Sequence, residues 1–289
     1  MGVAGGGLGG EGPCQTLSAV PSHPPLPPIP SKPPLPASCY MPSPAHPSSD
    51  ALPLPPFTPH PAARTPQNRL ESFYKSQAGL YDQYRHRMLH GRRPMMFQMP
   101  APAGGVWVDL GGGTGSNLEY FRAAGGGETL SAAFSKVFVV DLTPSLLEVA
   151  RARVTERGWG EKVETVLGDA TNPNLPGLPP AGTADVVTIS YAVTMIPDWK
   201  AAIANAKRLL KPGGHLCVCD FTVDPASQSA AMQKFWTFIF STDHVHLSPD
   251  HVPHLQAEFK QTLLQRGYGT FPYVPGLLKC PYYIFIGRK

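Results

Sequence analysis

The chain has 289 residues and a net charge of +4, and 15% of its residues are charged. No run of lysines and arginines marks a nucleic-acid footprint, so nucleic acid is not an expected partner. No apolar stretch reaches the roughly 18–20 residues that a membrane-spanning helix needs. The five cysteines form neither a C-x-x-C pair nor a Cys/His metal motif, so no metal site is expected.

Prolines concentrate near the N-terminus. More than half of the 35 prolines precede Gln67, and runs such as PPLPPIPSKPPLP (24–36) favour polyproline II and cannot build a core. We therefore expect residues 1–66 to be a disordered tail and residues 67–289 to form one domain with an ample core. The tail is interpreted as a passive spacer. A ligand for an SH3-like domain and a transit peptide are the alternatives.

Strand and helix patterns alternate from Val106 onward. Apolar strands are predicted at 106–111, 136–141, 163–170, 184–192 and 215–221, and helices at 116–124, 143–154 and 198–210. A helix over 253–266 is expected to end at Gly267, and the segments 268–274 and 281–289 to pair at the sheet edge. The predicted fold is α/β and Rossmann-like. It has a mostly parallel seven-stranded sheet, an antiparallel C-terminal strand and helices on both faces.

Residues 69–96, ahead of the first strand, carry apolar and aromatic side chains at roughly helical spacing. We expect one or two lid helices here, within 67–100, over the carboxyl edge of the sheet. The aromatic residues are interleaved with arginines, which is typical of an interfacial helix, so segment 74–93 is also expected to touch a membrane. Its arginines are Arg85, Arg87, Arg92 and Arg93. A plain amphipathic helix packed on the sheet is the alternative.

The sequence DLGGGTG, 109–115, directly follows the first strand. Glycines permit a tight turn and a close approach of the backbone to a ligand, and the next helix points N–H groups at it. A dehydrogenase fingerprint would need glycine where Ser116 stands, and no Walker lysine follows. The spacing is instead typical of proteins that bind S-adenosylmethionine, the predicted cofactor. The predicted cofactor-binding residues in this motif are Asp109, Gly111, Gly113 and Gly115.

Acidic residues end the next two strands as well. Asp141 is placed to accept both ribose hydroxyls, with Leu142 beside it. Asp169 suits the adenine amino group, and the backbone N–H of Ala170 a ring nitrogen. Ligands of open α/β sheets bind at the carboxyl ends of the strands, so these residues and Asp109 are expected to line one pocket.

The segment SYAVTMIPDW, 190–199, follows the fourth strand. In the predicted fold this loop borders the methyl group that S-adenosylmethionine transfers. Ser190 and Tyr191 are predicted to meet the substrate and to accept a hydrogen bond from its amine. Ser190 is also assigned to the cofactor site. Packing of Tyr191 beneath the cofactor is the alternative. Tyr81 and Arg85 are the candidates for the cofactor's methionine carboxylate, because Arg can bind a carboxylate with two hydrogen bonds. Tyr81 is also predicted, with Ser190 and Tyr191, to be a catalytic residue.

Several segments together resemble the betaine lipid synthase family, specifically its BtaB-type N-methyltransferase module. They are FYKSQAGLYDQYRHRMLHGR, VWVDLGGGTGSN, VVDLTPSLLEVARAR, GDA, SYAVTMIPDW, LKPGG and PYYIFIGRK. The resemblance covers nearly all of residues 68–289 and implies a class I methyltransferase. It implies three S-adenosylmethionine-dependent N-methylations that turn diacylglyceryl homoserine into diacylglyceryl-N,N,N-trimethylhomoserine, a betaine lipid.

The resemblance also implies a setting for the enzyme. The substrate is a lipid at a membrane surface, and a BtaA-type aminocarboxypropyltransferase is the expected partner or fusion. We expect a cytoplasmic protein peripheral to a membrane such as the endoplasmic reticulum. Aromatic faces would hold the quaternary ammonium product, and the candidates are Tyr81, Tyr191, Trp199, Phe235 and Trp236. The alternatives are methylation of another small or lipid substrate, such as a quinone precursor, and an inactive cofactor-binding module.

Overall fold

The structure is a computed structural model that describes residues 66–75, 88–121, 130–225, 228–241, 245–270 and 279–289. The chain divides into two units, Met1–Thr58 and Pro59–Lys289, and every described residue belongs to the second. Apart from Pro66, which begins the first helix, the predicted tail lies outside the described residues.

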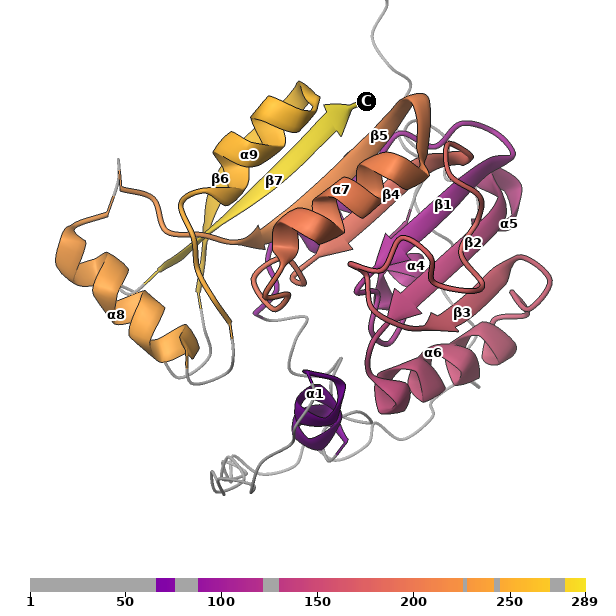
Figure 1. The fold of residues 1–289 in the computed structure, drawn as a ribbon, viewed down its shortest axis with the longest axis horizontal. Helices are drawn as coiled ribbons and strands as arrows, with labels where there is room; N and C mark the ends of the chain where they lie inside the picture. Colours follow the sequence, from indigo (N-terminus) through magenta and orange to yellow (C-terminus); the bar gives the residue numbers. More distant parts are fainter. Residues whose placement is uncertain (1–65, 76–87, 122–129, 226–227, 242–244, 271–278) are drawn as a thin grey trace, which may run out of the picture. The chain divides into compact units, whose positions relative to one another are not determined.

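Seven strands among the described residues form one sheet, in the order β3-β2-β1-β4-β5-β7-β6 (Figure 1). Neighbouring strands are parallel except that β7 runs antiparallel to both β5 and β6. The strands are β1 Gly105–Leu110, β2 Phe134–Asp141, β3 Val163–Leu167, β4 Ala184–Ser190, β5 Leu210–Phe221, β6 Lys260–Gly269 and β7 Cys280–Arg288. The predicted fold class is confirmed.

Helices cover both faces of this sheet. They are α1 Pro66–Tyr74, α3 Arg92–Gln98, α4 Ser116–Tyr120, α5 Leu130–Ala133, α6 Pro144–Glu156, α7 Trp199–Leu209, α8 Ala230–Ser241 and α9 His251–Glu258. α7 begins after Asp198, whose carboxylate caps the helix by accepting a hydrogen bond from the N–H of Ala201 at 3.1 Å. Within the described ranges, none of the helices combines the length and hydropathy needed to cross a bilayer.

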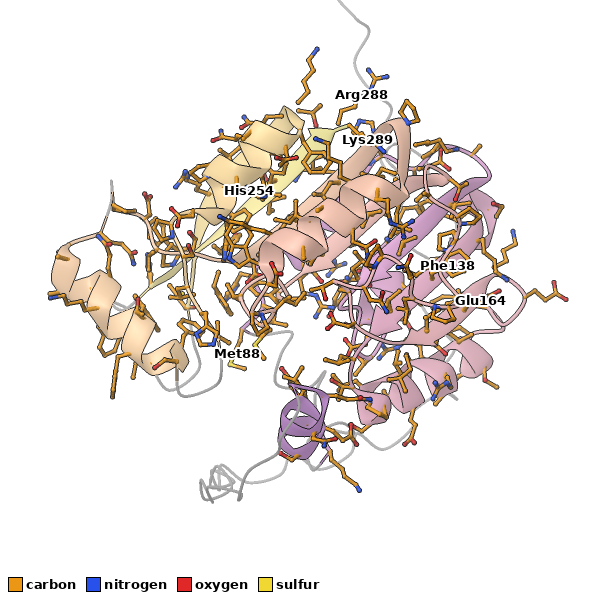
Figure 2. The ribbon with its side chains drawn as sticks, in the orientation of Figure 1. Met88, Phe138, Glu164, His254, Arg288 and Lys289 are labelled. Atoms are coloured by element: carbon orange, nitrogen blue, oxygen red, sulfur yellow. The ribbon has the colours of Figure 1, made fainter. Side chains whose placement is uncertain are left out.

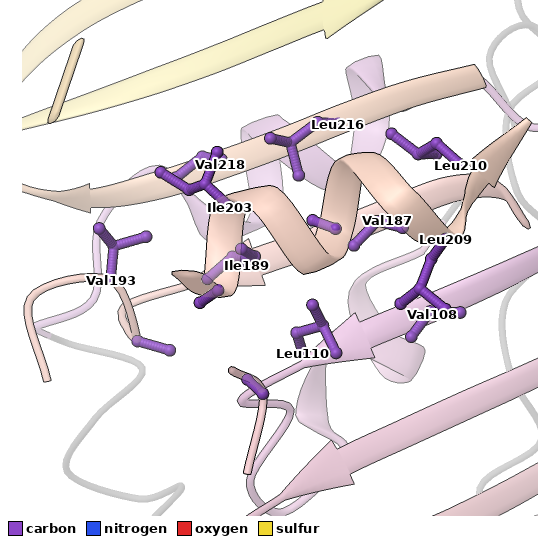
Figure 3. Close-up of a cluster of buried hydrophobic side chains, with 14 of the residues drawn as sticks. Val108, Leu110, Val187, Ile189, Val193, Ile203, Leu209, Leu210, Leu216 and Val218 are labelled. Atoms are coloured by element: carbon purple, nitrogen blue, oxygen red, sulfur yellow. The ribbon is translucent and has the colours of Figure 1, made fainter. Parts of the chain in front are cut away.

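One face of the sheet packs against α7 and α9. Successive strand residues point to opposite faces, so alternate positions of each strand share this core. Figure 3 shows Ile203 and Leu209 of α7 lying over the sheet, near Val187 and Val218. All four side chains are fully buried, and each contributes roughly 1.5–3 kcal/mol by leaving water.

The opposite face packs against α3, α4, α5 and α6. Met95 and Met96 of α3 and Leu147 of α6 are fully buried against Trp107 in this second cluster. The indole Nε1 of Trp107 donates a hydrogen bond to Thr188 Oγ1 at 2.8 Å, so β1 and β4 are joined by side chains as well as by backbone.

The prediction of a helix over 253–266 is wrong for the residues after Glu258. α9 ends at Glu258, Phe259 has an extended backbone with φ −134°, and β6 begins at Lys260. Apolar residues in this segment have the spacing of a helix face, but its backbone pairs with β7 instead. Tertiary pairing here overrides the local pattern.

Three other predicted elements are too long. β3 ends at Leu167, and α4 ends at Tyr120 because Phe121 has an extended backbone. β4 ends at Ser190, because Tyr191 has a φ of 54° in the left-handed region and turns the chain out of the sheet.

α1 packs near the carboxyl ends of the parallel strands. Glu71 Oε2 accepts hydrogen bonds from the N–H and the hydroxyl of Ser145, at 3.1 and 3.0 Å, at the start of α6. Met88 lies at the same end of the sheet, and Arg288 and Lys289 lie at the other (Figure 2). The remainder of the predicted lid, residues 76–87 with Tyr81, Arg85 and Arg87, lies outside the described residues.

Candidate functional site

The glycine-rich turn joins β1 to α4. Gly111 and Gly113 have φ values of 69° and 55°, a region that residues with a Cβ rarely adopt. At Gly111 a Cβ would also lie 2.5 Å from the Cβ of Ala192, so this position has no room for a side chain. The turn therefore brings bare backbone up to the loop that follows β4.

A cavity of about 280 Å³ opens at this turn. The glycine-rich turn, the loops after β2, β3 and β4, and α1 all contribute to its wall. Its lining residues include Leu70, Tyr74, Leu89, Arg92, Gly111, Gly112, Gly113, Thr114, Ser116, Asp141, Leu142, Asp169, Ala170, Ser190, Tyr191, Met195, Ile196, Asp198 and His246. Most of the described residues that the sequence assigned to the site thus lie around one space.

Asp141 holds its carboxylate at the cavity through backbone hydrogen bonds. Oδ2 accepts from the N–H of Gly113 and Oδ1 from the N–H of Thr143, both at 2.8 Å. Burial raises the pKa of Asp141, and these two N–H groups oppose the rise. The carboxylate thus ties the end of β2 to the glycine-rich turn.

Asp169 and Ala170 form the wall after β3. Asp169 Oδ1 accepts hydrogen bonds from the N–H and the hydroxyl of Thr171, both at 2.8 Å. The carbonyl of Ala170 accepts from the side-chain amide of Asn205 on α7 at 2.8 Å. These contacts fix the loop at the edge of the cavity.

Asp109 does not line the cavity, and the prediction that it does is wrong. Its side chain is fully buried, and it accepts hydrogen bonds from Asn117 Nδ2 and from the hydroxyl of Thr188. Burial raises its pKa to about 6, against the lowering effect of those hydrogen bonds. Asp109 therefore positions α4 from beneath the site. Gly115, at the start of α4, also lies outside the lining.

Arg92 was predicted to face a membrane, and the structure places it in the cavity wall instead. Its side chain is only 6% exposed. The guanidinium donates from Nε and Nη2 to Asn117 Oδ1, at 3.0 and 2.9 Å, and from Nη2 to the hydroxyl of Ser116. Helical spacing revealed an arginine-bearing helix but could not show which arginine points inward.

Ser190 and Tyr191 lie where β4 leaves the sheet. Ser190 Oγ accepts a hydrogen bond from Asn117 Nδ2 at 2.9 Å, and the hydroxyl of Tyr191 donates to the carbonyl of His90. Burial raises the pKa of Tyr191 well above its ordinary value, so its phenol stays protonated at neutral pH. Tyr191 both lines the cavity and packs edge-on against Phe221, with ring centroids 4.5 Å apart.

The loop after Tyr191 is anchored by a buried acid that the sequence did not single out. Asp220, at the end of β5, accepts hydrogen bonds from the N–H and the hydroxyl of Thr194, at 3.2 and 2.7 Å. Burial raises the pKa of Asp220 to about 7, while the contacts with Thr194 lower it. Thr194 precedes the cavity residues Met195 and Ile196, so Asp220 holds this part of the cavity wall in position.

A family model described as a methyltransferase domain matches residues 108–218, from β1 into β5. Residues 108–218 thus form a class I, S-adenosylmethionine-dependent methyltransferase domain. The ubiquinone/menaquinone biosynthesis C-methyltransferase UbiE of Roseobacter denitrificans is 32% identical over 173 residues, 57% of this chain and 63% of that protein. The chain thus spans less than two thirds of the length of this relative.

Solved structures share the fold of the methyltransferase domain. The YcgJ protein of Bacillus subtilis has a TM-score of 0.54 at 18% identity, over 69% of this chain and 98% of its own. The 1,6-didemethyltoxoflavin-N1-methyltransferase of Burkholderia thailandensis, which holds S-adenosylhomocysteine, has a TM-score of 0.51 at 21% identity, over 80% and 93%. The predicted enzyme class and cofactor are confirmed at the level of this domain.

The cavity of the methyltransferase domain fits its cofactor. Gly111 and Gly113 bring backbone without side chains to the cavity beside the carboxylate of Asp141, and a Cβ at Gly111 would collide with Ala192 at 2.5 Å. Asp141 would hold the ribose, Asp169 and Ala170 the adenine, and the backbone at Gly111 the methionine end.

The predicted aromatic cage is not assembled by the described candidates. Tyr191 lines the cavity, but Trp199 packs edge-on against His251, and Trp236 is buried against Phe240. Phe235 is 38% exposed on α8. Trp199, Phe235 and Trp236 are therefore not cage residues in this arrangement, because none of them lines the cavity.

Proposed function

We propose that the methyltransferase domain transfers three methyl groups to the amine of a diacylglyceryl homoserine lipid and produces the trimethylated betaine lipid. The resemblance of segments spread over residues 68–289 to the BtaB-type module supports this assignment. The observation that carries it is a buried apolar cluster that connects the cavity wall to α8, a helix with exposed apolar side chains on its outer face.

Leu89, Tyr191 and Met195 line the cavity and also belong to, or pack against, a separate apolar cluster. That cluster continues through Phe221 to two buried side chains of α8, which are Trp236 and Phe240. Packed apolar side chains thus connect the cavity wall to α8.

The outer face of α8 is apolar as well. Phe238 is 69% exposed, Ile239 42% and Phe235 38%, and α8 contains Lys234 but no acidic residue. Adjacent exposed aromatic and aliphatic side chains mark interaction surfaces, and the absence of acids suits an anionic lipid surface. We place the membrane contact of the enzyme on α8, in place of the arginine-bearing segment.

The chemistry requires an amine with a free lone pair. When bound, S-adenosylmethionine supplies the electrophilic methyl group. The cavity residues align the amine with that methyl group and keep water away, which supplies much of the rate of an in-line displacement. Ser190 and Tyr191 contribute neutral oxygens beside the amine. The amine is protonated in water, so its ammonium form loses one proton for each of the three methyl groups that it receives.

The setting of the enzyme follows from this chemistry. A BtaA-type enzyme, separate or fused, would supply the homoserine lipid by transferring an aminocarboxypropyl group to diacylglycerol. The domain would act at the cytoplasmic surface of the membrane that holds this lipid, such as the endoplasmic reticulum.

A second candidate is C-methylation of a quinone precursor. The name of the UbiE relative describes that reaction, and a quinone precursor with a lipid tail would also suit the exposed apolar side chains of α8. Attack by a ring carbon is helped by deprotonation of a neighbouring phenol, and His246 in the cavity wall is a group that can accept such a proton.

A transfer assay with both acceptors separates the two functions. The purified chain is given methyl-labelled S-adenosylmethionine and micelles that contain either diacylglyceryl homoserine or a demethylated quinone precursor. We expect label in the homoserine lipid, and His246→Gln to retain that activity. Label in the quinone precursor alone, with its loss in His246→Gln, would replace the proposed function by the second candidate.

A further inference from the structure

Arg92 is a buried cation whose hydrogen-bond partners are neutral. Its guanidinium is held by the side chains of Asn117 and Ser116, and it lies 5.5 Å from the ring centroid of Tyr120. Among the described residues it forms no ion pair with a carboxylate. Burying a charge is costly unless the charge is paired, so this arrangement suits an anionic ligand.

The carboxylate of Asp109 interacts with the charge of Arg92 but compensates it only in part. Asp109 is separated from the guanidinium by the Asn117 amide, whose oxygen faces Arg92 and whose nitrogen faces Asp109. Asp109 is also shared with Thr188. The Asn117 amide therefore stands between the two charges, and the guanidinium makes no hydrogen bond to Asp109.

Space for an anion lies beside Arg92. Arg92 lines the main cavity and also a second one of about 200 Å³, which Leu89, Arg93 and Tyr120 complete. Its Nη1 group makes no hydrogen bond to the described residues, although Nε and Nη2 do. Two N–H groups of a fixed guanidinium thus remain for a ligand next to the glycine-rich turn.

We propose that Arg92 binds a carboxylate in the methyltransferase cavity. A guanidinium whose other donors are already anchored presents its remaining N–H groups in a fixed direction, which suits the planar carboxylate. This carboxylate could come from two molecules: the cofactor, at its methionine end, or the lipid substrate, in its homoserine headgroup. The second source rests on the proposed function, and the first does not.

The cofactor source is tested by calorimetry without turnover. S-adenosylhomocysteine is compared with its decarboxylated analogue, S-adenosyl-3-thiopropylamine, on the parent chain, on Arg92→Gln and on the matched surface control Arg151→Gln. If Arg92 binds the cofactor carboxylate, Arg92→Gln weakens S-adenosylhomocysteine at least tenfold and leaves the analogue unchanged. Arg151→Gln changes neither affinity.

The substrate source is tested by KM. Diacylglyceryl homoserine is compared with its carboxyl methyl ester, which lacks the negative charge. If Arg92 binds the substrate carboxylate, Arg92→Gln raises KM at least tenfold for the acid but not for the ester, and cofactor affinity is retained. Absence of lipid methylation in the parent chain would overturn the proposed function while the calorimetric comparison still stood.

The proposal is overturned if Arg92→Gln has the same effect on each carboxylate ligand and on its counterpart without the carboxylate in both comparisons, because Arg92 would then only support Asn117. Arg92→Lys replaces Arg92→Gln in both comparisons if the Gln variant does not fold. Lys keeps the positive charge but lacks the planar pair of donors of Arg, so a smaller loss of affinity is expected, still confined to the ligands with a carboxylate.

Discussion

Asn117 donates hydrogen bonds from its amide nitrogen to both carboxylate oxygens of Asp109, each at 3.0 Å. The same amide accepts from Arg92 and donates to Ser190, so one neutral side chain links a buried anion, a buried cation and the end of β4. Asn117 belongs to the first turn of α4, which directly follows the glycine-rich turn. This network fixes the positions of Arg92 and Ser190, which line the cavity.

The first prediction concerns pH and Asp109. Burial raises its pKa from 3.8 to about 6, so the folded chain binds a proton between these values that the unfolded chain has released. The stability from this proton is fully present below pH 3.8 and is lost as pH rises through about 6. Asp109→Asn lacks this titration. We therefore expect the unfolding free energy of the parent to fall relative to the variant from pH 4.5 to 7. Urea unfolding across this range checks it, and parallel pH curves would contradict the raised pKa.

The second prediction concerns Asp141. Asp141→Ala removes the acceptor assigned to the ribose and leaves cofactor hydroxyls poorly paired, which costs on the order of 1–3 kcal/mol in cofactor affinity. Gly113→Val should weaken binding strongly, because a φ of 55° is a conformation that a β-branched residue rarely adopts, so the turn beside Asp141 would be distorted. Titration calorimetry with S-adenosylhomocysteine measures both. Unchanged affinity in both variants would show that the cofactor lies elsewhere.

The third prediction concerns Tyr191. Its hydroxyl donates to the carbonyl of His90 and its pKa lies well above the ordinary value, so it is not the group that takes the substrate's proton. Tyr191→Phe should lower kcat less than about tenfold, below the 10²–10⁴-fold contribution of a general base. Its pH–rate profile should match the parent. Loss of a limb of that profile in the variant would make Tyr191 the base.

The fourth prediction concerns α8. Phe238→Ser combined with Ile239→Ser removes the most exposed apolar side chains of this helix and should weaken co-sedimentation with liposomes that contain anionic lipid. Tyr268→Ser is the matched control, because Tyr268 is 47% exposed and belongs to β6 rather than to α8. Affinity for S-adenosylhomocysteine should stay at the parent value in each case. Equal co-sedimentation of the parent and the α8 variant would remove α8 as the membrane contact.

The strand ends that carry Asp141, Asp169 and Ser190 could be predicted because three signals coincide there. Uniformly apolar strands, the glycine motif and acids at successive strand ends all indicate the same edge of a parallel sheet. These features depend on local sequence and on a topology that few arrangements satisfy.

The orientation of single side chains could not be predicted in the same way. Arg92 and Arg93 are neighbours in an arginine-rich segment, yet Arg92 is buried and Arg93 is exposed. Asn117 and Asp220 have no motif of their own, since their roles arise only when α4 meets β1 and when β5 meets the loop after β4. The helix predicted beyond Glu258 failed for a related reason, because pairing with β7 is a long-range contact that local spacing does not report.

The most direct test of the account is mass spectrometry of lipids from bacteria that co-express this chain with a BtaA-type enzyme. The account predicts diacylglyceryl-N,N,N-trimethylhomoserine with the parent chain, and accumulation of the unmethylated homoserine lipid with Asp141→Ala produced at the same level. Unmethylated lipid alone with a folded, cofactor-binding parent chain would contradict the proposed substrate.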